Sequence, residues 1–294
     1  MKPVSPAAAW AAWGTCAVIW GSTFLAIAYG NDSVPPVWGA TLRLGLATGI
    51  LGVILAVRRQ PLPRGRALVA ALLFGLFQFG INLPLLYLGE TQVPSGLSAV
   101  IFATIPLSTA FLTWVFRLEP LRPARIAGAL IAVLGVGLIF SAQLSARVKP
   151  WPLLFVLLSS WSGCLAVVLL KRGPHQSPVA ANAVGAAVGA AVCLVWSRAL
   201  GEPQVLPHGW TGVLPVVYLA VVGSVVAFVL MAWLVNHWDV SRISYISVIV
   251  PLVALTLGAV LRHERVSTQS LVGAGIVLTG VVIGLQLWRP QAHS

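Results

Sequence analysis

Charged side chains are scarce along this chain. Only 8% of its 294 residues are charged and 59% are hydrophobic, whereas soluble domains carry roughly 25% charged residues. This composition excludes an ordinary soluble domain. Apolar runs of about 20 residues recur from one end of the sequence to the other, and a helix of that length crosses the hydrocarbon core of a bilayer. The sequence therefore predicts an integral membrane protein whose surface contacts lipid.

Cysteine and the common catalytic motifs are also rare or missing. Cys16, Cys164 and Cys193 lie inside apolar runs, with no CxxC pair or neighbouring histidine. This argues against a disulfide framework and a metal site, and we predict no metal and no cofactor. The DxxxD, HExxH and GxSxG patterns and a P-loop are absent, which argues against ATP-driven transport and against an intramembrane enzyme, the alternative from another class.

The predicted fold is an all-α integral membrane protein with ten transmembrane helices. Short joints containing Pro, Asn, Asp or Gly separate the apolar runs, as expected where helices end. The predicted spans are 8–29, 36–57, 67–88, 95–116, 124–142, 151–170, 178–200, 211–235, 240–261 and 268–288.

The 18 Lys and Arg residues outnumber the 6 Asp and Glu residues, which gives a net charge of +12. Because these basic residues lie in the short joints, they indicate topology rather than nucleic-acid binding. With the N-terminus in the cytoplasm, twelve basic residues fall on the cytoplasmic side and five on the other. The positive-inside bias therefore predicts that both termini are cytoplasmic.

An internal repeat is the most informative feature of the sequence. The positions that match at a constant separation are Pro106 and Pro251, Leu107 and Leu252, Glu119 and Glu264, Gly128 and Gly273, and Gly135 and Gly280. This indicates a duplication, with one repeat at 1–145, another at 146–294, and one integrated transport domain. Because each repeat holds five spans, the second must be inverted, as in many secondary transporters.

The chain resembles the EamA-type members of the drug/metabolite transporter (DMT) superfamily. The resemblance rests on the segment Trp20-Gly21-Ser22-Thr23-Phe24, on Arg43, and on the repeated Pro, Glu and Gly pattern. Within that superfamily the chain is similar to bacterial YddG-type exporters. This similarity implies an inner-membrane exporter of aromatic amino acids with a central cavity. The second repeat departs from the pattern, because Trp161-Ser162-Gly163-Cys164 replaces the Trp-Gly-Ser-Thr of the first.

Polar and aromatic side chains inside the predicted spans are the candidates for the substrate-binding cavity. Amides and hydroxyls suit a zwitterion, and aromatic rings suit a flat or cationic substrate. The same side chains could instead join neighbouring helices or fill the core. The candidates are Trp20, Ser22, Thr23, Phe24, Gln78, Phe79, Asn82, Phe102, Trp161, Ser244 and Tyr245.

Arg43 is the charged residue that the spans place inside the membrane, where a charge is costly. We predict a gate or structural role for it, through a pair with Asp32 or Glu90, with capture of a substrate carboxylate as the alternative. Pro106 and Pro251 are the predicted hinges. A further pair of glutamates, Glu119 and Glu264, is expected to pair with Arg117 and Arg262.

The predicted function is export of amino acids, with aromatic or large neutral ones as the expected substrates, by alternating access through a central cavity. Efflux of cationic amphiphiles is the competing transport function. No carboxylate or histidine lies deep in a predicted span, so we expect facilitated flux. The expected partners are a small-molecule substrate and the lipid bilayer, not nucleic acid, and the expected state is a monomer or a weak homodimer.

Overall fold

The computed structural model describes residues 5–93, 95–141, 149–262 and 267–286, and within these ranges all the regular structure is helical. The elements are α1 (Pro6–Asn31), α2 (Pro36–Val57), α3 (Arg66–Phe74), η1 (Gly75–Ile81), α4 (Asn82–Glu90), α5 (Ser95–Phe102), α6 (Ile105–Val115), α7 (Pro123–Ile139), α9 (Pro150–Arg172), α10 (Pro178–Ala199), α11 (Gly209–Tyr218), η2 (Leu219–Val226), α12 (Ala227–His237), α13 (Val240–Ile243), α14 (Ile246–Arg262) and α15 (Thr268–Leu285).

Proline begins many of these helices, because its fixed φ suits the first turn and its missing N–H is not needed there. The helices that begin in this way start at Pro6, Pro36, Pro123, Pro150 and Pro178. Serine caps add to this: Ser5, Ser177 and Ser267 accept hydrogen bonds from the first-turn N–H groups. The predicted helix boundaries therefore agree with the structure within a few residues wherever the end is described.

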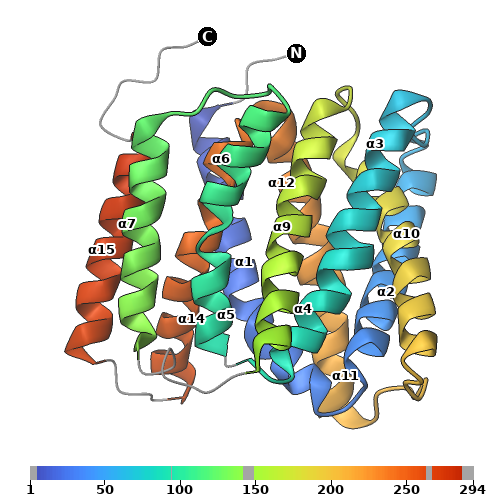
Figure 1. Ribbon diagram of the computed structural model, residues 1–294. Helices are drawn as coiled ribbons and strands as arrows, with labels where there is room; N and C mark the ends of the chain where they lie inside the picture. The colour runs from blue at the N-terminus through green and yellow to red at the C-terminus, as the bar shows by residue number, and fades with distance from the viewer. Residues whose placement is uncertain (1–4, 94, 142–148, 263–266, 287–294) are drawn as a thin grey trace.

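Eight helical segments of the described chain have the length and apolarity needed to cross a membrane. They begin with α2 and end with α15, and α3, η1 and α4 together form one of them, Arg66–Glu90. Helix α1 has 26 residues and α7 has 17, but neither is among the eight. The fold is thus an all-helical membrane bundle (Figure 1), and the count of ten spans stays a prediction.

The two halves of the chain interlock instead of forming separate domains. Helix α7 packs along α15, and α2 packs along α10, at opposite sides of the bundle (Figure 1). Helix α1 contacts α12 and α14 of the second half, and α9 contacts α4 and α6 of the first half. These contacts correspond to one another when the halves are exchanged, as expected for related repeats.

Glycines allow the close approach of α7 and α15. A Cβ atom added at Gly128 would overlap the backbone of Gly280 and Gly284, and one added at Gly135 would lie 2.7 Å from the backbone nitrogen of Val277. Small residues let membrane helices pack at short range. The glycines that match between the two repeats therefore meet across their interface.

Several spans are interrupted near the middle of the bundle. Two π-helical segments interrupt the α-helical structure: η1 lies between α3 and α4, and η2 lies between α11 and α12. Such segments are often found at functional sites. The helix also breaks at residues 103–104, before Pro106, and at residues 244–245. Pro251 lies inside the continuous α14. The repeated prolines therefore occupy different local structures, and their role as hinges stays a prediction.

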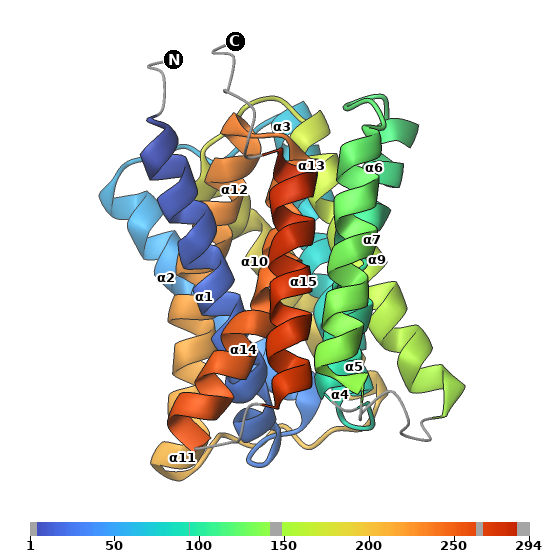
Figure 2. The ribbon, with the colours of Figure 1, turned by 90° about the vertical axis from the view of Figure 1, so that its left-hand side faces the viewer.

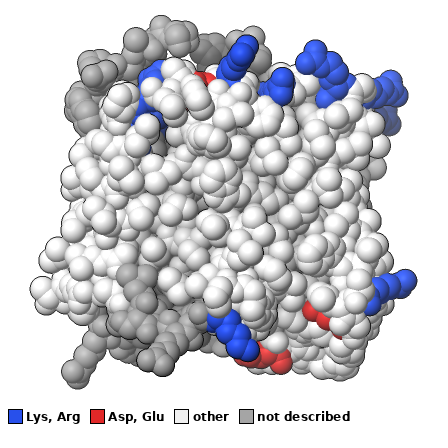
Figure 3. Space-filling view, in the orientation of Figure 1, with Lys and Arg blue, Asp and Glu red and all other residues white. Residues whose placement is uncertain are grey.

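The outer surface separates charge from apolar side chains. In Figure 3 the Lys, Arg, Asp and Glu side chains lie at the two ends of the molecule, and the band between them is uncharged. Large apolar side chains are exposed on the described helices, among them Val53, Leu134, Val195 and Leu271. An uncharged band together with exposed apolar side chains suits contact with hydrocarbon.

Candidate functional site

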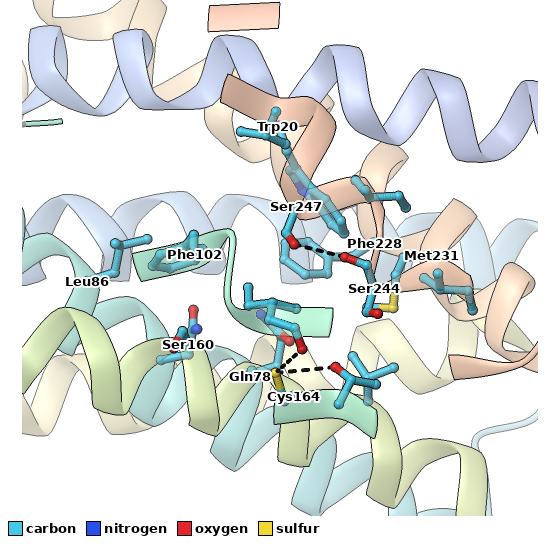
Figure 4. A pocket seen from close by; sticks show the side chains of 18 of the residues that line it. Trp20, Gln78, Leu86, Phe102, Ser160, Cys164, Phe228, Met231, Ser244 and Ser247 are labelled. Atoms are coloured by element: carbon cyan, nitrogen blue, oxygen red, sulfur yellow. Dashed lines mark hydrogen bonds between the residues drawn. The ribbon is translucent and has the colours of Figure 1, made fainter. Parts of the chain in front are cut away.

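A cavity of about 170 Å³ lies at the centre of the bundle. Residues of both halves line it, from α1, α2, η1, α4, α5 and α6 and from α9, α12, α13 and α14. Figure 4 shows Trp20, Phe102 and Phe228 beside the polar Gln78 and Ser244. At about 30 Å³ for each water, the volume has room for roughly five or six water molecules. An apolar cavity of about 150 Å³ is large enough for one benzene ring, so a small molecule of this size would fit.

The cavity contains a majority of the residues that the sequence predicted for it. The cavity candidates that line it are Trp20, Thr23, Gln78, Asn82, Phe102 and Ser244, and Arg43, the predicted gate residue, lines it as well. They come from segments that are distant along the chain, so the fold brings them together. The structure describes the backbone of Phe24 in α1 but not its side chain, so this residue lies outside the described set.

Ser22 and Phe79 do not line the cavity. The Ser22 hydroxyl donates to the carbonyl of Ile19, at 2.7 Å, and shares a second hydrogen bond with the Tyr218 hydroxyl. Phe79 is buried and packs edge-on against Phe74 and Phe228. These residues join helices and fill the core, which is the alternative that the sequence left open for such side chains.

Trp161 and Tyr245 also lie away from the cavity. Trp161 is 37% exposed on the outside of α9 and packs edge-on against Phe111. The residues of α9 that do line the cavity are Ser160, Gly163, Cys164 and Val167. Their spacing of three and four residues defines one helix face, and position 161 is on another. The expectation that Trp20 and Trp161 face one cavity is therefore wrong.

Tyr245 is buried among helices, with 1% of its surface exposed. Its hydroxyl donates to the backbone carbonyl of Arg125 at 2.6 Å. Its ring lies where a Cβ atom of residue 284 would be, so Gly284 provides the space for it. From the break before α14, Tyr245 thereby contacts α7 and α15, and it is not among the residues that line the cavity.

The polar groups of the cavity are held by neighbouring helices. The amide nitrogen of Asn82 donates to the carbonyl of Ser159 at 2.6 Å, which leaves its Oδ1 as an acceptor. A Cβ atom at position 163 would lie 2.9 Å from the Asn82 nitrogen, so Gly163 allows this contact. The Thr109 hydroxyl donates to the sulfur of Cys164 at 3.5 Å.

The cavity lining also includes residues that were not predicted for it. They are Phe228 and Met231 of α12, and Ile243 and Ser247 near the break before α14. Phe228 and Met231 are three residues apart and therefore share a helix face, but the apolar composition of their span does not show which face is turned inward. Ser247 could have been selected, since it is a polar residue inside a predicted span.

Arg43 is buried in the cavity wall with 3% of its surface exposed. Its Nε donates to the Ser224 hydroxyl at 2.7 Å, and its Nη1 donates to the Tyr87 hydroxyl at 3.3 Å. The expected pair with Asp32 or Glu90 is not formed. The guanidinium is therefore held by two neutral hydroxyls, one from each half of the chain.

A polar network joins the two halves at the end of the bundle where α1 begins and α15 ends (Figure 2). Arg125 of α7 pairs through Nη1 with Glu119 and through Nη2 with Asp239, both at 2.6 Å. Glu119 also accepts a hydrogen bond from the backbone nitrogen of Val240, at 2.7 Å. We call Glu119, Arg125, Asp239 and the first turn of α13 the latch.

The structure contradicts the expected partner of Glu119 and does not test the expected partner of Glu264. Glu119 pairs with Arg125, six residues along the chain, and not with Arg117. The reason is the turn of the chain after α6, where Arg117 adopts a φ of 56° and its side chain is exposed. The predicted pair of Arg262 and Glu264 lies outside the described side chains.

Charge also sets the protonation of the latch. Burial acts to raise the pKa of Asp239, but the hydrogen bond and charge of Arg125, with the charges of Arg122 and Arg242, hold it below its ordinary value. Asp239 is therefore ionised at neutral pH, so the network is favoured there. Since Val240 and Ile243 of α13 line the cavity, the latch holds a helix that covers one end of the site.

Comparison with known proteins identifies the family to which these features belong. The model of the EamA-like transporter family matches residues 8–141 and 150–285, once in each half. The uncharacterized inner membrane transporter YedA of Escherichia coli (strain K12) is 30% identical over 269 residues, covering 90% of this chain and 87% of its own.

Two further relatives have more specific names. A probable amino-acid metabolite efflux pump of Escherichia coli (strain K12) is 26% identical and covers 92% of this chain and 93% of its own. A probable terminal-alkyne amino-acid exporter of Streptantibioticus cattleyicolor is 29% identical, with coverages of 90% and 89%. A crystal structure with 20% identity superposes with a TM-score of 0.78 over 97% of this chain and 99% of that chain, which supports the fold.

Proposed function

Because this chain belongs to the EamA-like transporter family, we propose that it exports amino acids, with aromatic or large neutral ones preferred, by alternating access through the central cavity. The single observation that carries the proposal is the cavity itself. It has an apolar wall that includes Trp20, Phe102 and Phe228, and a few polar groups that converge from both halves. Such a lining suits a small molecule with one apolar and one polar end.

The chemistry of the cavity lining favours this substrate class. Aromatic rings and the flexible side chain of Met231 can pack against a large apolar side chain. The amides of Gln78 and Asn82 and the guanidinium of Arg43 can bind the charged groups of an amino acid. Two of the relatives are named for efflux or export of amino acids.

The proposed orientation is a bacterial inner membrane with both termini on the cytoplasmic side. The segments that join α2 to α3 and α6 to α7, with the last turn of α9, contain Arg58, Arg64, Arg122 and Lys171. Figure 1 shows these segments at the end of the bundle where α1 begins, and the positive-inside rule puts such an end on the cytoplasmic side. The YedA relative is named an inner membrane transporter. In this orientation the latch lies at the cytoplasmic end of the cavity.

Alternating access requires that each end of the cavity can close in turn. We propose that the latch keeps the cytoplasmic end closed and opens when the substrate enters from the cytoplasm. The interlocked halves support this proposal. Helix α1 of the first half contacts α14 of the second half, and α9 of the second half contacts α6 of the first. Each half therefore has an equivalent set of contacts with the other. A related pair of packings can then exchange around a fixed site.

The experiment is flux in proteoliposomes that contain the purified protein. Labelled tryptophan, phenylalanine, threonine and alanine are supplied, with and without imposed pH and Na⁺ gradients. The proposal expects saturable flux that is faster for tryptophan and phenylalanine and that needs no ion gradient. Empty liposomes and protein with Trp20→Ala are the controls, and absence of amino-acid flux under every gradient would refute the proposal.

The pH gradient is included because of Glu90 at the end of α4. Its Oε1 is buried and has no hydrogen-bond partner in the described part of the chain. A carboxyl group in such a place can carry a proton. If the flux depends on the pH gradient in the wild type but not in Glu90→Gln, the mechanism is proton-coupled transport and not facilitated flux. The proposed substrate stays the same.

A further inference from the structure

The charge of the cavity wall has one sign. Arg43 is buried there, and the residues that line the cavity include no Asp or Glu in the described part of the chain. Both described ion pairs belong to Arg125. A buried cation without an anion is unfavourable in a medium of low dielectric constant. The guanidinium would therefore gain from an anionic group that enters the cavity.

The structure holds the guanidinium in a fixed position. Ser224 of η2 accepts from Nε, and Tyr87 of α4 accepts from Nη1. A Cβ atom at position 223 would lie 3.2 Å from Nη2, so Gly223 leaves room for the group. No described hydrogen bond uses Nη2. The two hydrogen bonds to the neutral hydroxyls of Ser224 and Tyr87 orient the planar guanidinium group. Arginine in such an arrangement is suited to the two oxygens of a carboxylate.

We infer that Arg43 binds the carboxylate of the transported substrate, so that the cavity selects carboxylates with an apolar side chain and rejects amines that lack a carboxylate. This inference rests on the proposed function, which it makes more specific. The apolar rings of Trp20 and Phe228 then contact the side chain. Asn82 also lines the cavity, and its Oδ1 can accept a hydrogen bond from an ammonium group, but it offers no opposite charge as Arg43 does for a carboxylate.

The selectivity follows from the missing acid. A cationic amphiphile would place a second positive charge in the cavity with Arg43, and like charges in a low dielectric repel. The competing function, efflux of cationic amphiphiles, therefore disagrees with the charge of the wall. An anionic group without an ammonium would still be bound, so the carboxylate is the feature that matters most.

The experiment compares three indole compounds that differ in their charged groups. They are tryptophan, which has both groups, indole-3-propionate, which has the carboxylate only, and tryptamine, which has the ammonium only. Binding to the purified wild-type protein is measured by calorimetry, and flux is measured in proteoliposomes. We expect the two carboxylates to bind and tryptamine to bind at least tenfold more weakly.

The variants Arg43→Gln, Arg43→Lys and Ser224→Ala are measured in parallel, with Arg58→Gln in an exposed loop as the matched control. Loss of a hydrogen bond to a charged group corresponds to about tenfold to hundredfold weaker binding, and we expect this for both carboxylates in Arg43→Gln. The lysine variant keeps the charge and should lose less. Ser224→Ala should weaken binding a few-fold, since it frees the guanidinium, and Arg58→Gln should leave it unchanged.

The outcomes separate this inference from the proposed function. Tryptophan flux with equal binding of tryptamine in the wild type would overturn the inference and leave amino-acid export standing. Binding of indole-3-propionate without tryptophan flux would support the inference and refute amino-acid export. If Arg43→Gln does not fold, the wild-type selectivity and Ser224→Ala decide. A folded Arg43→Gln with wild-type selectivity would also overturn the inference.

Discussion

Replacing Arg125 with glutamine should release the latch and open the cavity on the side of α13. Arg125 makes two charge-assisted hydrogen bonds of 2.6 Å, to Glu119 and to Asp239. The pair with Glu119 is largely buried, with side-chain exposures of 10% and 7%, whereas Asp239 is 49% exposed. The buried pair therefore contributes most of the stabilisation.

The magnitude follows from this difference in burial. Removing one partner of a buried pair costs about 3–5 kcal/mol, and a solvent-screened pair contributes about 0–1 kcal/mol. If the closed packing alone contains these bonds, the equilibrium between closed and open packings shifts by about a hundredfold or more. The matched control is Arg122→Gln, which removes the same charge from an exposed position at the start of the same helix.

Hydrogen exchange measured by mass spectrometry is the assay, because the backbone N–H groups of Val240 and Ser241 donate to Glu119. Exchange of the segment 240–246 should become faster in Arg125→Gln and stay at the wild-type rate in Arg122→Gln. Exchange in α2 should not change in either variant, which separates opening from general unfolding. Wild-type protection of 240–246 in a folded Arg125→Gln variant would refute the latch.

Three more predictions concern the site and the packing that supports it. Trp20→Ala should lower tryptophan flux at least tenfold because its ring lines the cavity, whereas Trp161→Ala should leave flux unchanged because that ring is outside; equal effects in the flux assay would contradict the site. Gly128→Ala should destabilise the protein by about 1–3 kcal/mol through overlap with α15, whereas Gly137→Ala, which meets open space on the same helix, should not; thermal unfolding in detergent tests the pair, and equal melting temperatures would contradict the close approach. Because the pKa of Asp239 in the folded protein is lowered, its stabilisation of the latch is present above the ordinary pKa and is lost as the pH falls through the folded pKa. Protection of 240–246 from hydrogen exchange should therefore fall at acidic pH in the wild type. Asp239→Asn should show lower protection at neutral pH and no such dependence on pH.

The sequence predicted the helices well because their signals are local. Apolar runs, prolines at first turns and serine caps lie next to the residues that they organise, so the boundaries of α2 and α10 agree with the predictions. The repeat was also readable, since the matched Pro, Glu and Gly positions keep a constant separation. The family model matches both halves, on either side of the expected boundary.

The inward faces were harder to predict because every face of a membrane helix is apolar. Trp161 and Ser160 are neighbours in the sequence, yet one contacts the outside and the other the cavity. Arg125 gave a topology signal in the sequence and became the centre of a network between the halves. Its partner Asp239 is 114 residues away, and no local pattern connects them.

The sequence by itself therefore determined that this chain is a helical membrane protein with a duplicated plan, because hydrophobicity and helix termination act within one or two turns. Only the tertiary structure decided which residues meet in the cavity and which join the helices. It also decided that Arg43 is held by hydroxyls of both halves and not by an acid. These contacts depend on the rotation of each helix about its axis, which is set by packing against several neighbours at once.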